Sequence, residues 1–292
     1  MPNTQRAFSG IEWLLLGSAL LVVGLIIGHF MSEMRKDIET RERDRLTVQA
    51  RVIHDALEQQ IDTINRTLVG IRDELPYWRS ESDGMAQAQR RLKAFADAMP
   101  AVRTLSILDA QGNVLASNQD TLLGKNFAER DYFQVAARNP NIDTLYLGPP
   151  FRTALGAFGM NMVRMVRGPN GEFAGIVSAT LSPDELTRTL ESVRYAPDTW
   201  AALAHGDGKL FLIAPLQEQL LGVDLAQPGS LFLRHQESGK ATNIMTGRVL
   251  LTGAWRMMAL HTVQPPALKM DKPMVVAISR DLDAMYVSWR EE

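Results

Sequence analysis

The stretch EFAGIVSATLSPDEL (residues 172–186) reads as a strand that runs straight into a helix, and MVVAISRDLDAM (residues 274–285) repeats this pattern later in the chain. Both stretches contain a run of β-branched and small apolar residues, which favours a strand. Ser182 followed by Pro183 is typical of a helix start, because serine can cap the first turn and proline fits into it. The recurrence predicts two copies of one α+β unit.

Each copy also contains a strand, a turn and a second strand. In the first copy RTLSIL (residues 103–108) and NVLAS (residues 113–117) flank a turn, and in the second copy Asp207-Gly208 forms the turn within residues 200–214. Further strands are predicted at residues 159–167, 242–253 and 254–263, and helices at residues 85–99 and 127–139. The fold class is therefore α+β, with an antiparallel sheet of about five strands in each copy.

A long helix is predicted over residues 32–75, because this segment is rich in helix-forming residues and contains no proline and no glycine before Gly70. Pro76 is expected to end it. Apolar residues recur at spacings of three and four: Leu46, Ala50, Ile53, Leu57, Ile61, Ile64, Leu68, Ile71 and Leu75. This stripe either packs on the sheets that follow, which we favour from Leu57 onward, or forms the seam of a homodimer.

The N-terminal stretch WLLLGSALLVVGLIIGHFM (residues 13–31) contains no charged residue and is long enough to cross a bilayer as a helix. A cleavable signal peptide would have a shorter apolar run and a small-residue cleavage site, and neither is present. A buried core helix would need partners on every face. The stretch is therefore interpreted as a transmembrane anchor.

The charges that flank the anchor conflict with the orientation that we adopt. Arg6 precedes it, whereas five basic residues follow it within a short distance: Arg35, Lys36, Arg41, Arg43 and Arg45. Counted alone, they predict that the N-terminus lies outside. Large domains can nevertheless be translocated regardless of nearby charge, so we expect residues 1–12 in the cytoplasm and residues 32–292 in the periplasm, with the anchor in the inner membrane.

Composition excludes several classes of protein. The net charge of -2 provides no broad basic field for nucleic acid. The absence of cysteine excludes disulfides, zinc–thiolate sites and thiol nucleophiles. The five histidines show no metal-binding spacing, and no nucleophile motif or phosphate-binding glycine loop occurs. We therefore expect no enzyme activity and no cofactor in this chain.

Several motifs, taken in order, resemble the double-Cache (tandem PAS-like) family of extracellular sensors, especially the branch that precedes diguanylate cyclases. These motifs are SILDAQGNVLAS (106–117), GKNFAERDYFQVA (124–136), LYLGPPFRTALGAF (145–158), residues 161–186, and AISRDLDAMYVSW (277–289). The resemblance implies a membrane-distal PAS-like domain at residues 76–195 and a membrane-proximal one at residues 196–286. It also implies that residues 287–292 begin a link to a second span and an output domain such as a cyclase or a histidine kinase.

The resemblance implies that a small molecule binds in the distal domain. Arg130, Tyr132 and Phe133 are the first candidate contacts, and Tyr146, Arg152 and Arg164 the second. Converging arginines favour a carboxylate, because the guanidinium fork matches its two oxygens. Alternatively, Arg130 pairs locally with Glu129 or Asp131, and Phe133 belongs to the core.

Thr180 occupies the position at which amino-acid-binding members of the family carry an aspartate that receives the ligand's ammonium group. A neutral hydroxyl cannot supply that charge. Carboxylates and other anions therefore rank above free amino acids as ligands.

Two functions from different classes fit these patterns. The first is a ligand-binding sensor that signals along the long helix. The second is a membrane-anchored module that binds a partner protein and no small molecule, which predicts a filled distal core and an exposed apolar patch. A secreted hydrolase would need a catalytic set that the sequence does not show.

Overall fold

The structure is a computed structural model that describes residues 10–153 and 158–286. The N-terminal residues 1–9 and the predicted link at residues 287–292 lie outside the described residues. The chain divides into two compact units, with the boundary between Arg45 and Leu46. The first unit contains the anchor and the second contains both sheets.

The N-terminal part of helix α1 (Gly10–Ser80) contains the predicted anchor. From Trp13 to Met31 its side chains are exposed. This is a helix that by length and composition could cross a membrane. A lipid environment would cover a helix that has exposed apolar side chains on every side.

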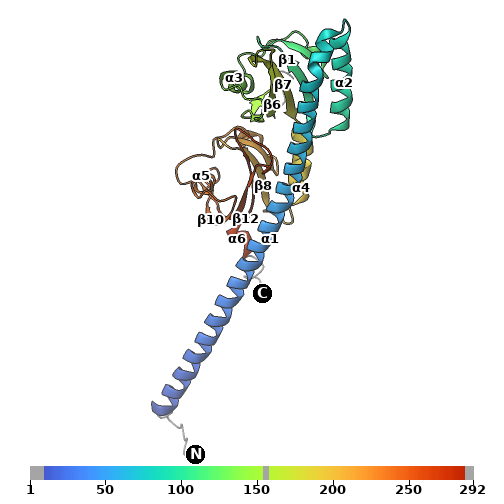
Figure 1. The fold of residues 1–292 in the computed structure, drawn as a ribbon. Helices are drawn as coiled ribbons and strands as arrows, with labels where there is room; N and C mark the ends of the chain where they lie inside the picture. Colours follow the sequence, from blue (N-terminus) through green and yellow to red (C-terminus); the bar gives the residue numbers. More distant parts are fainter. Residues whose placement is uncertain (1–9, 154–157, 287–292) are drawn as a thin grey trace, which may run out of the picture. The chain divides into compact units, whose positions relative to one another are not determined.

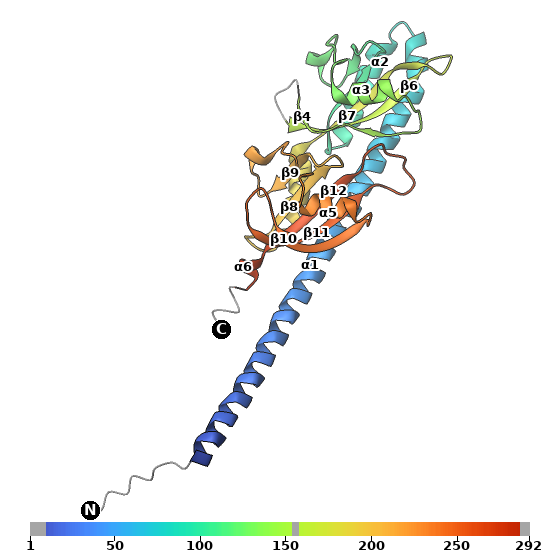
Figure 2. The same cartoon turned by 90° about the vertical axis from the view of Figure 1, so that its left-hand side faces the viewer.

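Two five-stranded antiparallel sheets make up most of the second unit (Figures 1 and 2). The first sheet has the order β2-β1-β7-β6-β3. Its strands are β1 (Val102–Leu108), β2 (Val114–Ser117), β3 (Tyr146–Leu147), β6 (Asn161–Arg167) and β7 (Phe173–Leu181). A separate small hairpin joins β4 (Phe151–Arg152) to β5 (Phe158–Gly159).

The second sheet has the order β10-β11-β12-β8-β9. Its strands are β8 (Trp200–His205), β9 (Leu210–Ala214), β10 (Thr242–Arg248), β11 (Trp255–Val263) and β12 (Met274–Asp281). If the second sheet is read from β9 to β10, its strands follow one another in the same order as their counterparts in the first sheet. The last strand of each copy, β7 or β12, lies in the centre of its sheet. The predicted α+β architecture with two antiparallel five-stranded sheets is confirmed.

Short helices connect the strands. They are α2 (Gly84–Ala98), η1 (Asp120–Leu122), α3 (Asp131–Arg138), α4 (Pro183–Ser192), η2 (Glu218–Leu220), α5 (Leu231–Glu237) and α6 (Leu282–Met285). Helix α4 begins after Ser182 as predicted, although the serine hydroxyl makes no capping hydrogen bond. Helix α5 was not predicted from the sequence, because its seven residues are too few to show a helical period.

Helix α1 continues past the proline that was expected to end it. The helix runs to Ser80, with Pro76 inside it. Trp78 extends the apolar stripe by one further step and is buried. We infer that packing of this tryptophan stabilises the last turn enough to offset the hydrogen bond that proline cannot donate.

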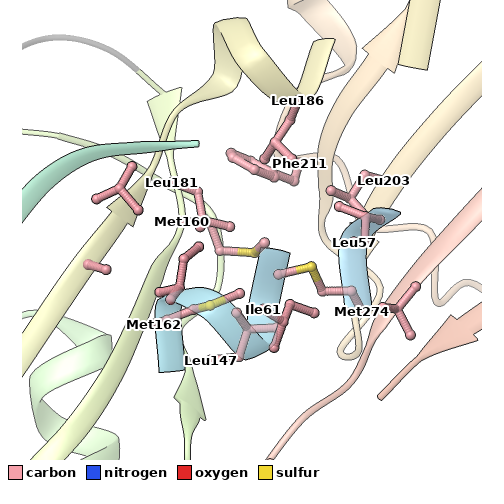
Figure 3. Close-up of a cluster of buried hydrophobic side chains, with 14 of the residues drawn as sticks. Leu57, Ile61, Leu147, Met160, Met162, Leu181, Leu186, Leu203, Phe211 and Met274 are labelled. Carbon is pink, nitrogen blue, oxygen red and sulfur yellow. The ribbon is translucent and has the colours of Figure 1, made fainter. Parts of the chain in front are cut away.

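The apolar stripe of α1 packs on its own chain. All nine predicted stripe residues, from Leu46 to Leu75, are buried in one cluster together with residues of both sheets. Figure 3 shows Leu57 and Ile61 of α1 beside Phe211, Leu203 and other side chains of that cluster. The stripe therefore packs on the sheets that follow it, as the favoured interpretation predicted. Within the described residues, this face of α1 is already covered.

Two loops join the sheets by hydrogen bonds. The Leu145 amide donates to the Lys269 carbonyl at 2.9 Å, and the Asp271 amide donates back to the Leu145 carbonyl at 3.2 Å. The Leu147 amide donates to Asp271 Oδ1 at 2.7 Å, and His205 Nε2 lies 3.0 Å from the Leu147 carbonyl. Burial raises the pKa of the Asp271 carboxyl, although the backbone donors oppose this shift.

Asp271→Ala is expected to lower the free energy of unfolding by about 1–3 kcal/mol, because the buried Leu147 amide would lose its acceptor. Asp271→Asn is the matched control, since its amide oxygen can still accept the bond. Urea denaturation followed by circular dichroism measures both variants. Equal stability of the two variants would show that this hydrogen bond does not stabilise the contact between the two sheets.

Candidate functional site

A small cavity lies on the face of the first sheet that is turned away from α1. Its volume is about 40 Å³, which is enough for water molecules but small for an organic ligand. The strands supply its floor, and Leu122, Phe127, Arg130, Tyr132 and Phe151 form much of its wall. A ligand would therefore have to displace some of these wall side chains.

The floor of the cavity is polar because alternate residues of a strand point to the same face. Thr104 and Ser106 of β1 pair with Thr180 and Ser178 of β7, and Asn161 of β6 pairs with Thr180. All five side chains are buried. The intervening residues, such as Leu105 and Val177, point to the other face and join the core around α1.

Two buried polar atoms of the cavity have no hydrogen-bond partner among the described residues. They are Thr153 Oγ1 and Asn161 Oδ1. Asn161 Nδ2 donates to Ser178 Oγ at 2.9 Å, so only the oxygen of this amide is unpaired. Buried polar atoms are rarely left unpaired, and these two are therefore candidates to contact a ligand or bound water.

Arg130 is the cation at the wall of the cavity. It precedes α3 as the N-cap residue, and its guanidinium donates to the Arg152 carbonyl at 3.4 Å and lies 5.4 Å from the centre of the Phe151 ring. Within the described residues no carboxylate lies at ion-pair distance from Arg130, so the predicted local pair with Glu129 or Asp131 does not form. Arg103, which also lines the cavity, approaches Asp184 only at 3.8 Å.

Tyr132 is the third predicted residue that lines the cavity, with Arg130 and Thr180. Burial raises the pKa of the Tyr132 hydroxyl to about 12, and the nearby Arg130 opposes this shift. The phenol is therefore neutral at physiological pH and can act as a hydrogen-bond donor.

The other four predicted contacts do not line this cavity. Phe133 is buried against Phe173, with the rings edge to face and their centres 5.5 Å apart, as the alternative interpretation expected of a core residue. The Tyr146 hydroxyl donates to the Asn139 carbonyl. Arg152 is exposed on β4.

Arg164 lies on the opposite face of the first sheet, because it is separated from Asn161 by an odd number of positions along β6. It is buried, and its Nε donates to Asn65 Oδ1 of α1 at 2.8 Å, while its Nη1 donates to the Ile142 carbonyl at 3.3 Å. Burial lowers the pKa of this guanidinium. Arg164 thus connects the sheet to the long helix.

Six polar residues of the cavity were missed by the sequence analysis, namely Arg103, Thr104, Ser106, Thr153, Asn161 and Ser178. A signal for four of them was present: small polar residues occupy alternate positions in strands that are otherwise apolar. Within the described residues, no group of three or more potential metal ligands occurs.

A pair of histidines lies between α1 and the second sheet. The rings of His54 and His261 are edge to face, with their centres 3.8 Å apart. Burial, with the neighbouring His54 as the next cause, lowers the pKa of His261 to about 4. His261 is therefore neutral in the folded protein near pH 6, whereas an unfolded chain would protonate it in part.

The free energy of unfolding is expected to fall as the pH is lowered from 7 towards 4, because the unfolded state binds the His261 proton and the folded state does not. Since His261 is only partly buried, we expect its contribution between pH 7 and pH 5 to be about 1 kcal/mol. Urea denaturation at pH 7 and pH 5 should show that the free energy of unfolding falls less between these pH values in His261→Gln than in the parent. The same pH dependence in the variant and the parent would contradict this assignment.

The comparisons with known proteins agree with this architecture. Two PAS-like sheets lie along one helix, and a cavity lies on the outer face of the first sheet. This fold is that of a tandem sensor domain. The model of the Cache domain family (dCache_1) matches residues 30–289. The chain therefore belongs to the Cache family, as the sequence motifs predicted. Among curated proteins none matches the sequence significantly.

Solved structures show the same fold at low identity. The extracellular domain of rpHK1S-Z16, a protein assigned as a histidine kinase, is 20% identical with a TM-score of 0.73, over 86% of this chain and 98% of that chain. The periplasmic sensory domain of the Campylobacter jejuni chemoreceptor Tlp1 is 12% identical with a TM-score of 0.68, over 86% and 98%. The ligand-binding domain of the Pseudomonas fluorescens chemoreceptor CtaA, solved with L-isoleucine, is 16% identical with a TM-score of 0.62, over 87% and 98%.

These matching chains are isolated domains, since this chain covers 98% of each. In this chain the residues from Leu46 onward form one compact unit with its own core. A fragment of residues 34–292 is therefore expected to fold without the anchor, and it is the protein used in the experiments below.

Proposed function

We propose that this chain is the ligand-binding sensor module of a membrane receptor, and that its ligand is a small carboxylate that also carries a hydroxyl group. The observation that carries this proposal is the cavity on the first sheet. Among the described residues, its lining contains two arginines, no aspartate or glutamate, and two buried oxygen atoms without partners.

The arginines favour an anionic ligand. Arg130 has no carboxylate partner within the described residues, and Arg103 has only a distant one. A guanidinium can bind a carboxylate through two parallel hydrogen bonds, which is a strong and directional interaction. The guanidinium of Arg130 thus has no counterion among the described residues, and a ligand carboxylate would supply one.

The floor favours a hydroxyl group beside that carboxylate. Asn161 Oδ1 can only accept a hydrogen bond, so its partner must be a donor. An ammonium group could also donate, as in the L-isoleucine with which the CtaA domain was solved. Because Thr180 is neutral and no acidic side chain of the described residues lines the cavity, a buried ammonium would lack a counterion, and a hydroxyl is preferred.

Strand β6 offers a route from the ligand to the long helix. Asn161 lies on the cavity face of this strand, and Arg164, on the other face, donates to Asn65 of α1. A shift of β6 on ligand binding would be transmitted through this hydrogen bond to α1. In the receptor that we propose, residues 76–195 form the membrane-distal domain, residues 196–286 the proximal domain, and residues 13–31 the anchor, with the output domain supplied beyond this module.

A panel of ligands tests this proposal. The melting temperature of residues 34–292 is measured against small hydroxy acids, plain carboxylates, amino acids and the corresponding neutral amides. We expect the largest increase with a hydroxy acid and none with its amide. A larger increase with an amino acid would overturn the preference for a hydroxyl, and no increase with any carboxylate would overturn the proposal in favour of a protein-interaction module.

A further inference from the structure

The second sheet also has a cavity, and it is far larger than the first. Its volume is about 440 Å³, against about 40 Å³ on the first sheet. It is bounded by β8, β9, β11 and β12, by α5, and by the loops around residues 223–230 and 249–251. Leu250 lines it and is 53% exposed, so the cavity reaches the surface at the loop between β10 and β11.

The two cavities occupy equivalent faces of the repeated fold. On the first sheet the paired residues Thr104–Thr180 and Ser106–Ser178 form the floor. On the second sheet the equivalent strands pair Ala204 with Val275 and Ala202 with Ala277, and all four residues line the larger cavity. The same place in the fold is thus polar in one copy and apolar in the other.

The floor of the larger cavity is made of small apolar side chains, three of them alanines. Protein interiors are normally packed with few voids larger than a water molecule. The first sheet shows that the same architecture can be filled almost completely by the side chains around it. An apolar space of about 440 Å³ lies within the range of small-molecule sites, which is roughly 300–1,000 Å³.

The polar residues of the lining are largely engaged within the protein. Asp224 accepts hydrogen bonds from Lys209 Nζ at 3.1 Å and from the Ala226 amide at 2.9 Å. Ser230 Oγ accepts a hydrogen bond from the Leu233 amide at 3.0 Å as the cap of α5. No lysine or arginine lines the cavity within the described residues, so an anionic ligand would find no counterion there, and the carboxylate that a cationic ligand would need, that of Asp224, is already paired with Lys209.

We propose that the cavity of the second sheet is a separate ligand site for a neutral, largely apolar small molecule. Burial of its apolar surface against the alanine, valine and leucine side chains of the lining would supply the affinity. The site is distinct from the carboxylate site of the first sheet, because none of the described residues lines both cavities.

The test uses the neutral fluorescent probe N-phenyl-1-naphthylamine and the fragment of residues 34–292. We expect a saturable increase in fluorescence with one probe per chain and a higher melting temperature. Ala277→Leu and Ala202→Leu place side chains inside the cavity and should each weaken binding by at least about tenfold, because one methylene in an apolar pocket already changes binding by that order. Ala94→Leu, on an exposed face of α2, is the matched control and should bind like the parent.

Two further variants keep the test decisive if a filled cavity disturbs folding. Leu250→Glu changes an exposed side chain at the opening, so it should fold normally and still weaken binding of the probe. Arg130→Gln should leave probe binding unchanged, because Arg130 lines the other cavity. No saturable binding by the parent, or equal binding by the Leu250 and Ala277 variants and the parent, would overturn the proposal.

Discussion

Phe211→Ala is expected to lower the free energy of unfolding by about 3–5 kcal/mol, the largest effect that we predict for a single substitution. Phe211 of β9 is completely buried. Its ring lies beside Leu186 of α4 and Leu203 of β8 (Figure 3). The centre of the ring is 6.2 Å from that of the Phe158 ring of β5, in the small hairpin. The side chain therefore joins the second sheet to helix α4 and to this hairpin, and a cavity at this position could not be filled by one local adjustment.

Urea denaturation of residues 34–292 measures this effect. Tyr77→Ala removes a comparable aromatic side chain from an exposed position and should change stability by no more than about 0.5 kcal/mol. A loss of less than about 1.5 kcal/mol for Phe211→Ala would show that the surrounding side chains collapse into the space, and that the ring does not hold the second sheet to its neighbouring elements.

Arg130→Gln is expected to weaken binding of the most effective carboxylate of the panel by about 30-fold or more, which corresponds to about 2 kcal/mol. The glutamine keeps a hydrogen-bond donor but loses the charge and the two parallel donors of the guanidinium. Arg130→Lys keeps the charge alone and should have an intermediate affinity. Isothermal titration calorimetry measures all three proteins.

The control is Arg188→Gln on α4, because Arg188 is exposed and does not line the cavity. Its affinity should equal that of the parent. If Arg130→Gln also binds like the parent, Arg130 does not contact the ligand, and Arg103 would remain as the cation of the site.

The fold could be predicted from local patterns because those patterns are dictated by burial. Alternation of apolar residues predicted the strands, and the spacing of Leu57, Ile61 and Ile64 predicted which face of the long helix is buried. Pro76 was misjudged because the stabilising contact, the burial of Trp78, depends on tertiary packing. Helix α5 was missed because it is too short for its period to be visible.

The site was harder to predict because the face on which a side chain lies depends on strand register. Arg130, Tyr132 and Thr180 were placed at the cavity, whereas Arg164, three residues after Asn161, lies on the other face of β6. A shift by one residue reverses the direction of every side chain in a strand. The pairing of β1 with β7, which brings Thr104 and Ser106 beside Thr180 and Ser178, joins residues that are far apart in the sequence.

The core that surrounds the apolar stripe of α1 is shared by both sheets, and this has a consequence for the cooperativity of the protein. Each repeated half has a smaller apolar cluster of its own, but the main core is shared, so a chain cut between the halves would expose apolar surface on each piece. The duplicated unit thus depends on its partner for stability, and the two halves should unfold together in one transition. Any binding energy gained at one sheet then stabilises the whole structure against unfolding, including the sheet that the ligand does not touch.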